Sequence, residues 1–129
     1  MRILRVLAIL LAAVSIAACT TAPIHNVSNA PIASASGKAL TDDQVKSAII
    51  RAGAALGWQM REIAPGKIGA SIALRKHTAE IEIPYSTKQY SIVYKNSTNL
   101  DEKGGQIHKN YNGWIQNLTR GINAQLSAS

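Results

Sequence analysis

The chain has 129 residues, of which 47% are hydrophobic, and its net charge of +7 comes from 14 basic and 7 acidic side chains. This length fits one domain with one core. The basic residues are dispersed, which argues against the nucleic-acid-binding arms that basic runs mark, and a single cysteine, Cys19, excludes an internal disulfide.

The first 18 residues are typical of a cleaved export signal. Arg2 and Arg5 give a basic start, and residues 6–18 form an apolar run in which Ser15 is the only polar member. A bilayer span needs about 20 apolar residues, so this run is too short to cross a membrane but suits the apolar region of a signal peptide. We therefore predict a signal peptide over residues 1–18.

The segment Ile16–Cys19 resembles the lipobox of bacterial lipoproteins, in which an aliphatic residue and two small residues precede a cysteine. The resemblance implies that the Cys19 thiol carries a diacylglyceryl group, and that cleavage frees its amino group for a further acyl chain such as palmitate. Several acyl chains anchor a protein stably where one is marginal. Thr20 stands where enteric-type lipoproteins of the inner membrane carry aspartate, which implies the periplasmic face of the outer membrane, with the inner membrane as the alternative.

Residues 20–40 are dominated by Ala, Ser, Thr and Asn and show no apolar period. Such a segment buries too little apolar surface to fold alone. We therefore predict a flexible tether over residues 19–40, followed by a single domain over residues 41–129.

The domain opens with a helix signal. Thr41 suits an N-cap, and Gln44, three residues later, completes a capping box. Apolar residues then recur at helical spacing until Gly57, a natural stop. These features predict a helix over residues 42–56.

Four strand-like segments follow, at residues 58–64, 67–75, 78–85 and 89–96. Their alternation places apolar side chains on one face of an antiparallel sheet. We predict that the turn between the second and third segments lies at residues 76–77. The predicted register then sets Met60 of the first segment opposite Ile72 of the second, Ile72 opposite Ile81 of the third, and Ile81 opposite Tyr94 of the fourth. A slip of one residue would break this common apolar face.

The chain then reads as a polar loop over residues 97–107 and a helix over residues 109–127, which Gly113 and Gly121 weaken. The predicted order is α-β-β-β-β-α. We expect an α+β fold in which both helices pack on one face of a four-stranded antiparallel meander.

The opposite face of the predicted sheet is polar, with Glu80 opposite Lys95 in the predicted register. A solvated surface explains it simply. The small residues of the second strand offer another interpretation, a shallow groove for an extended partner. The residues that would form this ligand or partner surface are Arg61, Ser71, Arg75 and Lys95.

The sequence carries no recognisable set of cofactor or metal ligands. His25, His77 and His108 are not spaced for a metal site, and neither a phosphate-binding loop nor a nucleophile elbow is present. We expect no cofactor, no nucleic-acid partner and no enzymatic activity. The remaining catalytic hypothesis is a cell-wall hydrolase that would use Glu80 and Glu82 as paired carboxylates.

Most of the chain is similar to small, uncharacterised lipoproteins of Gram-negative bacteria, through the lipobox, the strand-rich middle and the closing Tyr-Asn-x-Trp-Ile-x-x-Leu of residues 111–118. That resemblance implies no activity. Our leading hypothesis is a non-enzymatic envelope interaction module, tethered to the membrane through Cys19. The alternative is a binding module for an anionic envelope ligand such as lipopolysaccharide, phospholipid or peptidoglycan.

Overall fold

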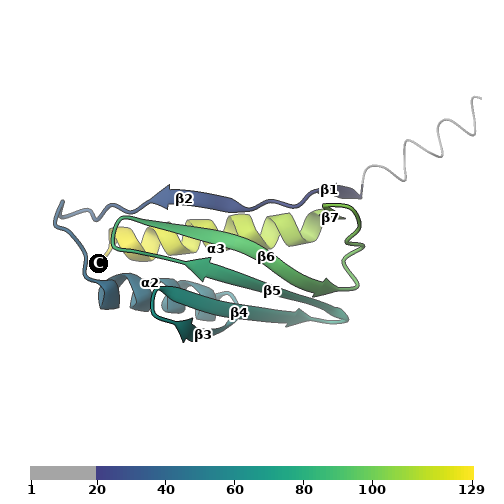
Figure 1. Ribbon diagram of the computed structural model, residues 1–129, viewed down its shortest axis with the longest axis horizontal. Helices are drawn as coiled ribbons and strands as arrows, with labels where there is room; N and C mark the ends of the chain where they lie inside the picture. Colours follow the sequence, from purple (N-terminus) through teal and green to yellow (C-terminus); the bar gives the residue numbers. More distant parts are fainter. Residues whose placement is uncertain (1–19) are drawn as a thin grey trace, which may run out of the picture.

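The computed structural model describes residues 20–129, so the predicted signal peptide and Cys19 lie outside the described residues. The α+β prediction is confirmed (Figure 1). In chain order the elements are β1 (Thr21–Pro23), β2 (Val27–Pro31), α2 (Asp42–Ala55), β3 (Gln59–Ala64), β4 (Lys67–Leu74), β5 (His77–Pro84), β6 (Gln89–Thr98), β7 (Gln106–His108) and α3 (Lys109–Ser127).

The main sheet has five antiparallel strands in the order β2-β6-β5-β4-β3. The expected four-stranded meander is present as β3 to β6, and β2 adds a fifth strand that the sequence did not predict. A second, two-stranded sheet pairs β1 with β7. Both helices lie behind the main sheet in Figure 1, so one sheet face is covered and the other, here called the outer face, is open.

The core lies between this sheet and the two helices. Alternate residues of each central strand point toward the helices, and the helices contribute apolar residues at helical spacing. The largest fully buried side chains are Tyr90, Tyr111, Ile49, Ile68, Ile81, Ile83, Ile92, Leu100, Ile107, Ile115, Leu118 and Ile122.

The predicted flexible tether is wrong for residues 21–23 and 27–31, which form β1 and β2. In β1, Thr21 lies opposite His108, and in β2, Val27 lies opposite Ile92. The sequence of this segment lacks an apolar period because it completes sheets that the rest of the chain builds. Its own burial could not stabilise it, but its partners supply the ladder hydrogen bonds.

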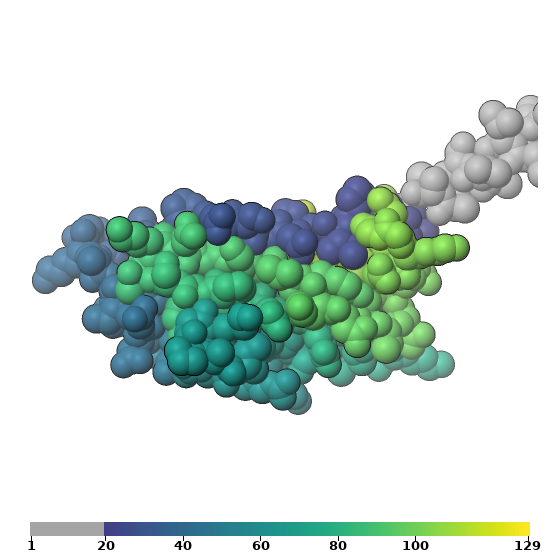
Figure 2. All heavy atoms as spheres, in the orientation of Figure 1, coloured from purple at the N-terminus to yellow at the C-terminus, as the bar shows by residue number. Residues whose placement is uncertain are grey.

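Side-chain hydrogen bonds between this segment and the domain add to these ladders. The backbone N–H of His25 donates to Asn112 Oδ1 and Asn112 Nδ2 donates to the Pro23 carbonyl, each at 2.9 Å. The Tyr94 N–H in turn donates to Asn26 Oδ1 at 2.9 Å. Figure 2 shows the N-terminal segment in purple, lying along the green of β6 as part of one continuous surface.

The helix predictions are confirmed closely. Helix α2 ends one residue earlier than expected, and both hydrogen bonds of the Thr41–Gln44 capping box are present. Helix α3 has the predicted bounds. Gly121 of α3 faces α2, where an added Cβ would lie 3.6 Å from the Ala52 Cβ.

The register of β4 with β5 differs from the prediction by two residues. Ile72 lies opposite Ala79 rather than Ile81, because the hairpin turns at residues 75–76 instead of 76–77. Arg75 takes the left-handed φ of 56° that tight hairpins require. A shift of two residues leaves every side chain on its predicted face, so the apolar pattern could not detect it.

The β3–β4 pair shows the same shift, with Met60 opposite Ala70 rather than Ile72. Glu62, near the end of β3, reaches Lys46 of α2 at 3.1 Å. This hydrogen-bonded carboxylate raises the pKa of Lys46 above its usual range. The pair lies at the exposed edge where α2 meets β3, which explains how a charged side chain is accommodated there.

The β5–β6 pair confirms the predicted alignment of Ile81 with Tyr94, but the register then shifts. An irregularity leaves Lys95 without a partner in the ladder and sets Glu80 opposite Asn96. The predicted pairing of Glu80 with Lys95 is therefore wrong. Bulges of this kind add one residue to one strand and change where the following side chains point.

Candidate functional site

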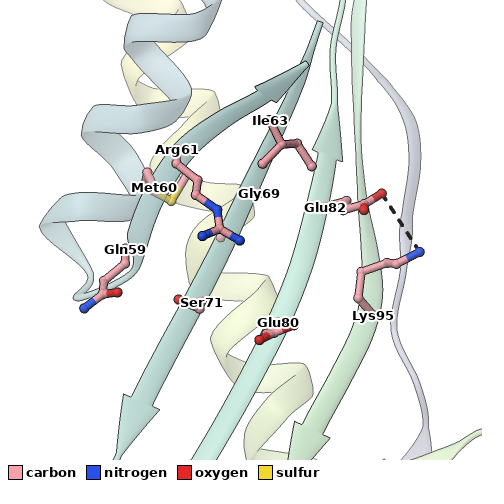
Figure 3. A pocket seen from close by; sticks show the side chains of 10 residues that line it. Gln59, Met60, Arg61, Ile63, Gly69, Ser71, Glu80, Glu82 and Lys95 are labelled. Atoms are coloured by element: carbon pink, nitrogen blue, oxygen red, sulfur yellow. Dashed lines mark ion pairs between the residues drawn. The ribbon is translucent and has the colours of Figure 1, made fainter. Parts of the chain in front are cut away.

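The outer face of the sheet contains a depression of about 420 Å³ that crosses β3, β4, β5 and β6. Its polar and charged lining comes from four strands, as Figure 3 shows. The lining residues are Gln59, Met60, Arg61, Ile63, Gly69, Ala70, Ser71, Glu80, Glu82 and Lys95.

The floor of the depression exists because β4 carries small side chains here. Gly69 lies opposite Arg61 on one side and Glu82 on the other. Ile63 Cγ2 would lie 3.0 Å from a Cβ added to Gly69, and Arg61 Nε would lie 3.7 Å from it. The absent side chain therefore lets Ile63 and Arg61 of the edge strand bend over β4, as Figure 3 shows, and form one wall of the depression.

A second depression of about 340 Å³ adjoins the first and shares Gln59, Ser71 and Glu80 with it. It continues toward Ala73 and Thr78 on β4 and β5. We call the two depressions together the outer groove. The stretch of small residues in β4 thus underlies a longer groove, of the kind that the sequence offered as an alternative to a plain solvated face.

Charges of both signs line this groove. Glu82 Oε2 lies 3.7 Å from Lys67 Nζ and 4.0 Å from Lys95 Nζ. The Glu82 side chain is 28% exposed, whereas those of the two lysines are 42% and 49% exposed. Glu82 therefore acts as a shared counter-ion, and its charge offsets part of the positive potential that Lys67 and Lys95 would present to a ligand.

Arg61 and Glu80 are the two other charged residues that line the first depression. Arg61 projects from β3 in the row of Gly69, and Glu80 projects from β5 in the neighbouring row, where it lies opposite Ser71 (Figure 3). Among residues 20–129, neither side chain makes an ion pair within 4.0 Å. A guanidinium and a carboxylate that both lack a charged partner can each receive an oppositely charged group of a ligand.

The structure brings three of the four residues predicted for the ligand surface into one site. Arg61, Ser71 and Lys95 all line the first depression. Arg75 does not, because it lies in the turn after β4 at the end of the sheet. Sequence reasoning missed Gln59 and Ile63, although the small residues of β4, Gly69 among them, were a sequence signal for open space beside the edge strand.

Both carboxylates of the hydrolase hypothesis line the depression, but their surroundings differ. Glu82 is occupied as the counter-ion of two lysines, whereas general acid or base catalysis needs a carboxyl group that can reach a substrate proton.

In the described part of the chain, no three His, Cys, Asp or Glu side chains gather in a way that could hold a metal ion. Neither helix over residues 20–129 is long and apolar enough to cross a membrane.

The aromatic residues at the start of α3 belong to the core. Tyr111 is fully buried and packs edge-on against Tyr94, with ring centroids 5.5 Å apart. Among residues 20–129 its hydroxyl group has no hydrogen-bond partner, and burial raises the pKa of Tyr111 far above the usual range. The Tyr90 hydroxyl donates to Asn123 Oδ1 at 2.7 Å, and burial raises the pKa of Tyr90 to about 12.

Comparison with protein-family models, with curated proteins and with solved structures finds no match to this chain.

Proposed function

We propose that this chain is a lipoprotein of the Gram-negative outer membrane, acylated at Cys19 and facing the periplasm, that acts by binding rather than by catalysis. Its outer groove would receive an extended segment of an envelope protein or polymer. The observation that carries this proposal is the groove itself, built across four strands and lined by Arg61, Ser71 and Glu80.

The charge pattern favours a partner that carries both signs. Arg61, Lys67 and Lys95 face Glu80 and Glu82 on the same surface, and Glu82 is shared between the two lysines. A polyanion would gain little from lysines that are already paired and would meet the uncompensated carboxylate of Glu80. A polypeptide with basic and acidic side chains, or a peptide-bearing wall polymer, fits this distribution better than a purely anionic ligand.

Photo-cross-linking in isolated envelopes tests the binding surface. A photoreactive residue at Ser71 would sit on the groove floor, and the same residue at Gln116, on the exposed side of α3, is the matched control. We expect discrete adducts from position 71 that are absent from position 116. Identical adducts from both positions, or none from position 71, would contradict the proposed groove.

The chemical nature of an adduct decides between the candidate partners. Protein or peptide adducts support the proposed function, whereas adducts that contain lipopolysaccharide or phospholipid support the anionic-ligand alternative. The anchor is tested separately by the mass of the mature chain and by Cys19→Ser. We expect the wild-type chain to carry a diacylglyceryl mass and to enter the outer-membrane fraction, and the variant to lack both properties.

A further inference from the structure

The folded domain begins directly after the proposed acylation site. The Thr20 carbonyl accepts a hydrogen bond from the Lys109 N–H at 3.1 Å, and Thr21 lies opposite His108 in the β1–β7 ladder. Consecutive Cα atoms are about 3.8 Å apart, so an acyl group on Cys19 would hold this end of the domain at the bilayer. A flexible tether of about 20 residues would instead allow an excursion of roughly 25 Å.

Two more segments lie at the same end of the molecule. These are the turn at residues 75–76 and the loop at residues 99–105, and Figure 1 places both at the end of the molecule that holds β1 and β7, opposite the C-terminus. Asn99 ties them together, because its Nδ2 donates to the Lys76 carbonyl at 2.7 Å and its carbonyl oxygen lies 2.7 Å from His77 Nδ1. We call this part of the surface the anchor end.

The anchor end has an excess of positive charge. It carries four exposed basic residues and two exposed acidic ones, namely Arg75, Lys76, Lys103 and Lys109 against Asp101 and Glu102. The opposite end, formed by residues 32–43 and the β5–β6 turn, is balanced, with Lys38 and Lys88 against Asp42 and Asp43. Basic side chains near a bilayer are attracted to its anionic head groups.

An exposed apolar side chain lies within this basic cluster. Leu74 is the last residue of β4 and has the inward orientation of the core residues in its strand, yet it is 44% exposed. Arg75 and Lys76 follow it directly in the turn. A leucine flanked by basic residues suits the boundary between head groups and acyl chains, where the leucine gains apolar contact and the charges stay at the head groups.

We propose that the anchor end lies against the anionic phospholipid leaflet, with Leu74 in the head-group region and Arg75, Lys76, Lys103 and Lys109 on the lipid phosphates. This inference rests on the proposed acylation of Cys19, because the anchor holds at the bilayer the end of the domain that carries these side chains, and charges act over only roughly 8 Å at physiological salt. The domain then stands on the membrane in one orientation, and its outer groove opens sideways into the periplasm.

Head-group quenching tests the orientation in the acylated full-length protein. A single fluorophore is attached at Ala73→Cys, beside Leu74, or at the matched far-end position Lys88→Cys, while the acylated Cys19 cannot react. The protein is reconstituted in vesicles of phosphatidylethanolamine and phosphatidylglycerol that contain a lipid with a quenching head group. We expect quenching several times stronger at position 73 than at position 88, and a weaker difference in phosphatidylcholine or at high salt.

Surface variants test which side chains make the contact. Each basic residue at an anionic surface changes the ratio of docked to undocked domain by about fivefold. Replacing Leu74, Arg75 and Lys76 by serine should therefore lower the quenching at position 73 to the far-end value. The control variant, Lys38→Ser with Lys88→Ser, removes two charges from the opposite end and should leave that quenching unchanged.

The outcomes separate this inference from the proposed function. Equal quenching at positions 73 and 88 in a chain whose mass shows the acyl group would overturn the fixed orientation and leave the anchor standing. Quenching at position 73 that survives the triple replacement would overturn the role of the named side chains. A mature chain without the acyl mass would overturn the anchor and, with it, the orientation.

Discussion

Helix α2 and the N-terminal segment of residues 20–31 are both well defined, but they are stabilised in different ways. Helix α2 is specified by local sequence features, namely a capping box at Thr41 and Gln44 and an apolar stripe along one side. The N-terminal segment has none. Its strands exist because β6, β7 and side chains such as Asn112 lie ready to pair with it. Local signals therefore reveal α2, while the other segment depends on contacts distant in sequence.

The largest expected effect comes from a core substitution in β7, the strand that pairs with β1 of the N-terminal segment. Ile107 of β7 is fully buried and lies opposite Ala22 of β1. Ile107→Ala should destabilise the protein by about 2–5 kcal/mol, because it removes buried methyl groups and leaves a cavity. Chemical denaturation measures the loss. A change below 1 kcal/mol (roughly the scale of an exposed substitution) would contradict the burial of this strand.

A smaller effect should separate the two regions. Asn112→Ala removes both side-chain hydrogen bonds to residues 23–25, at about 0.5–1.5 kcal/mol each. Hydrogen exchange of the His25 amide should accelerate while α2 stays protected. Gln116→Ala, on the exposed side of the same helix, is the control. Equal acceleration in both variants would show that Asn112 does not hold the segment.

The opposite test weakens α2 itself, by removing the side chain that caps its N-terminus. Thr41→Ala deletes the N-cap acceptor of the Gln44 N–H and should cost about 1 kcal/mol. Exchange should accelerate in the first turn of α2, and the β1–β7 ladder should keep its protection. If β1 opened as readily as α2, the two regions would form one cooperative unit and the comparison would fail.

The smallest effect concerns two buried tyrosines that adjoin the N-terminal segment. Tyr111 precedes Asn112, and its hydroxyl is unpaired within the described part of the chain, whereas Tyr90, opposite Ala30, donates to Asn123. Tyr111→Phe should stabilise the protein by up to about 1 kcal/mol, since it removes an unsatisfied buried group. Tyr90→Phe should destabilise it by a similar amount. Thermal melts of the two variants should shift in opposite directions, and shifts of the same sign would contradict this assignment.

The candidate site, like the fold, has one part that sequence alternation predicted and another that only tertiary contacts reveal. Alternation alone assigned Arg61 and Ser71 to the outer face and drew attention to the small residues of β4. It could not show that Gly69 admits the side chains of Arg61 and Ile63 over β4. Nor could it place Lys95 beside Glu82, since that pair depends on where the β5–β6 register shifts.

The sequence by itself determined the two helices, the inward and outward faces of four strands and the α+β class, because these follow from periodicity and capping within short stretches of chain. Only the tertiary structure decided the registers of β3–β4 and β4–β5, since a slip of two residues keeps every side chain on its face. It also decided that residues 21–23 and 27–31 are strands. This segment bonds to residues far along the chain, with 87 positions between His25 and Asn112 and 68 between Asn26 and Tyr94, and no local pattern reports such partners.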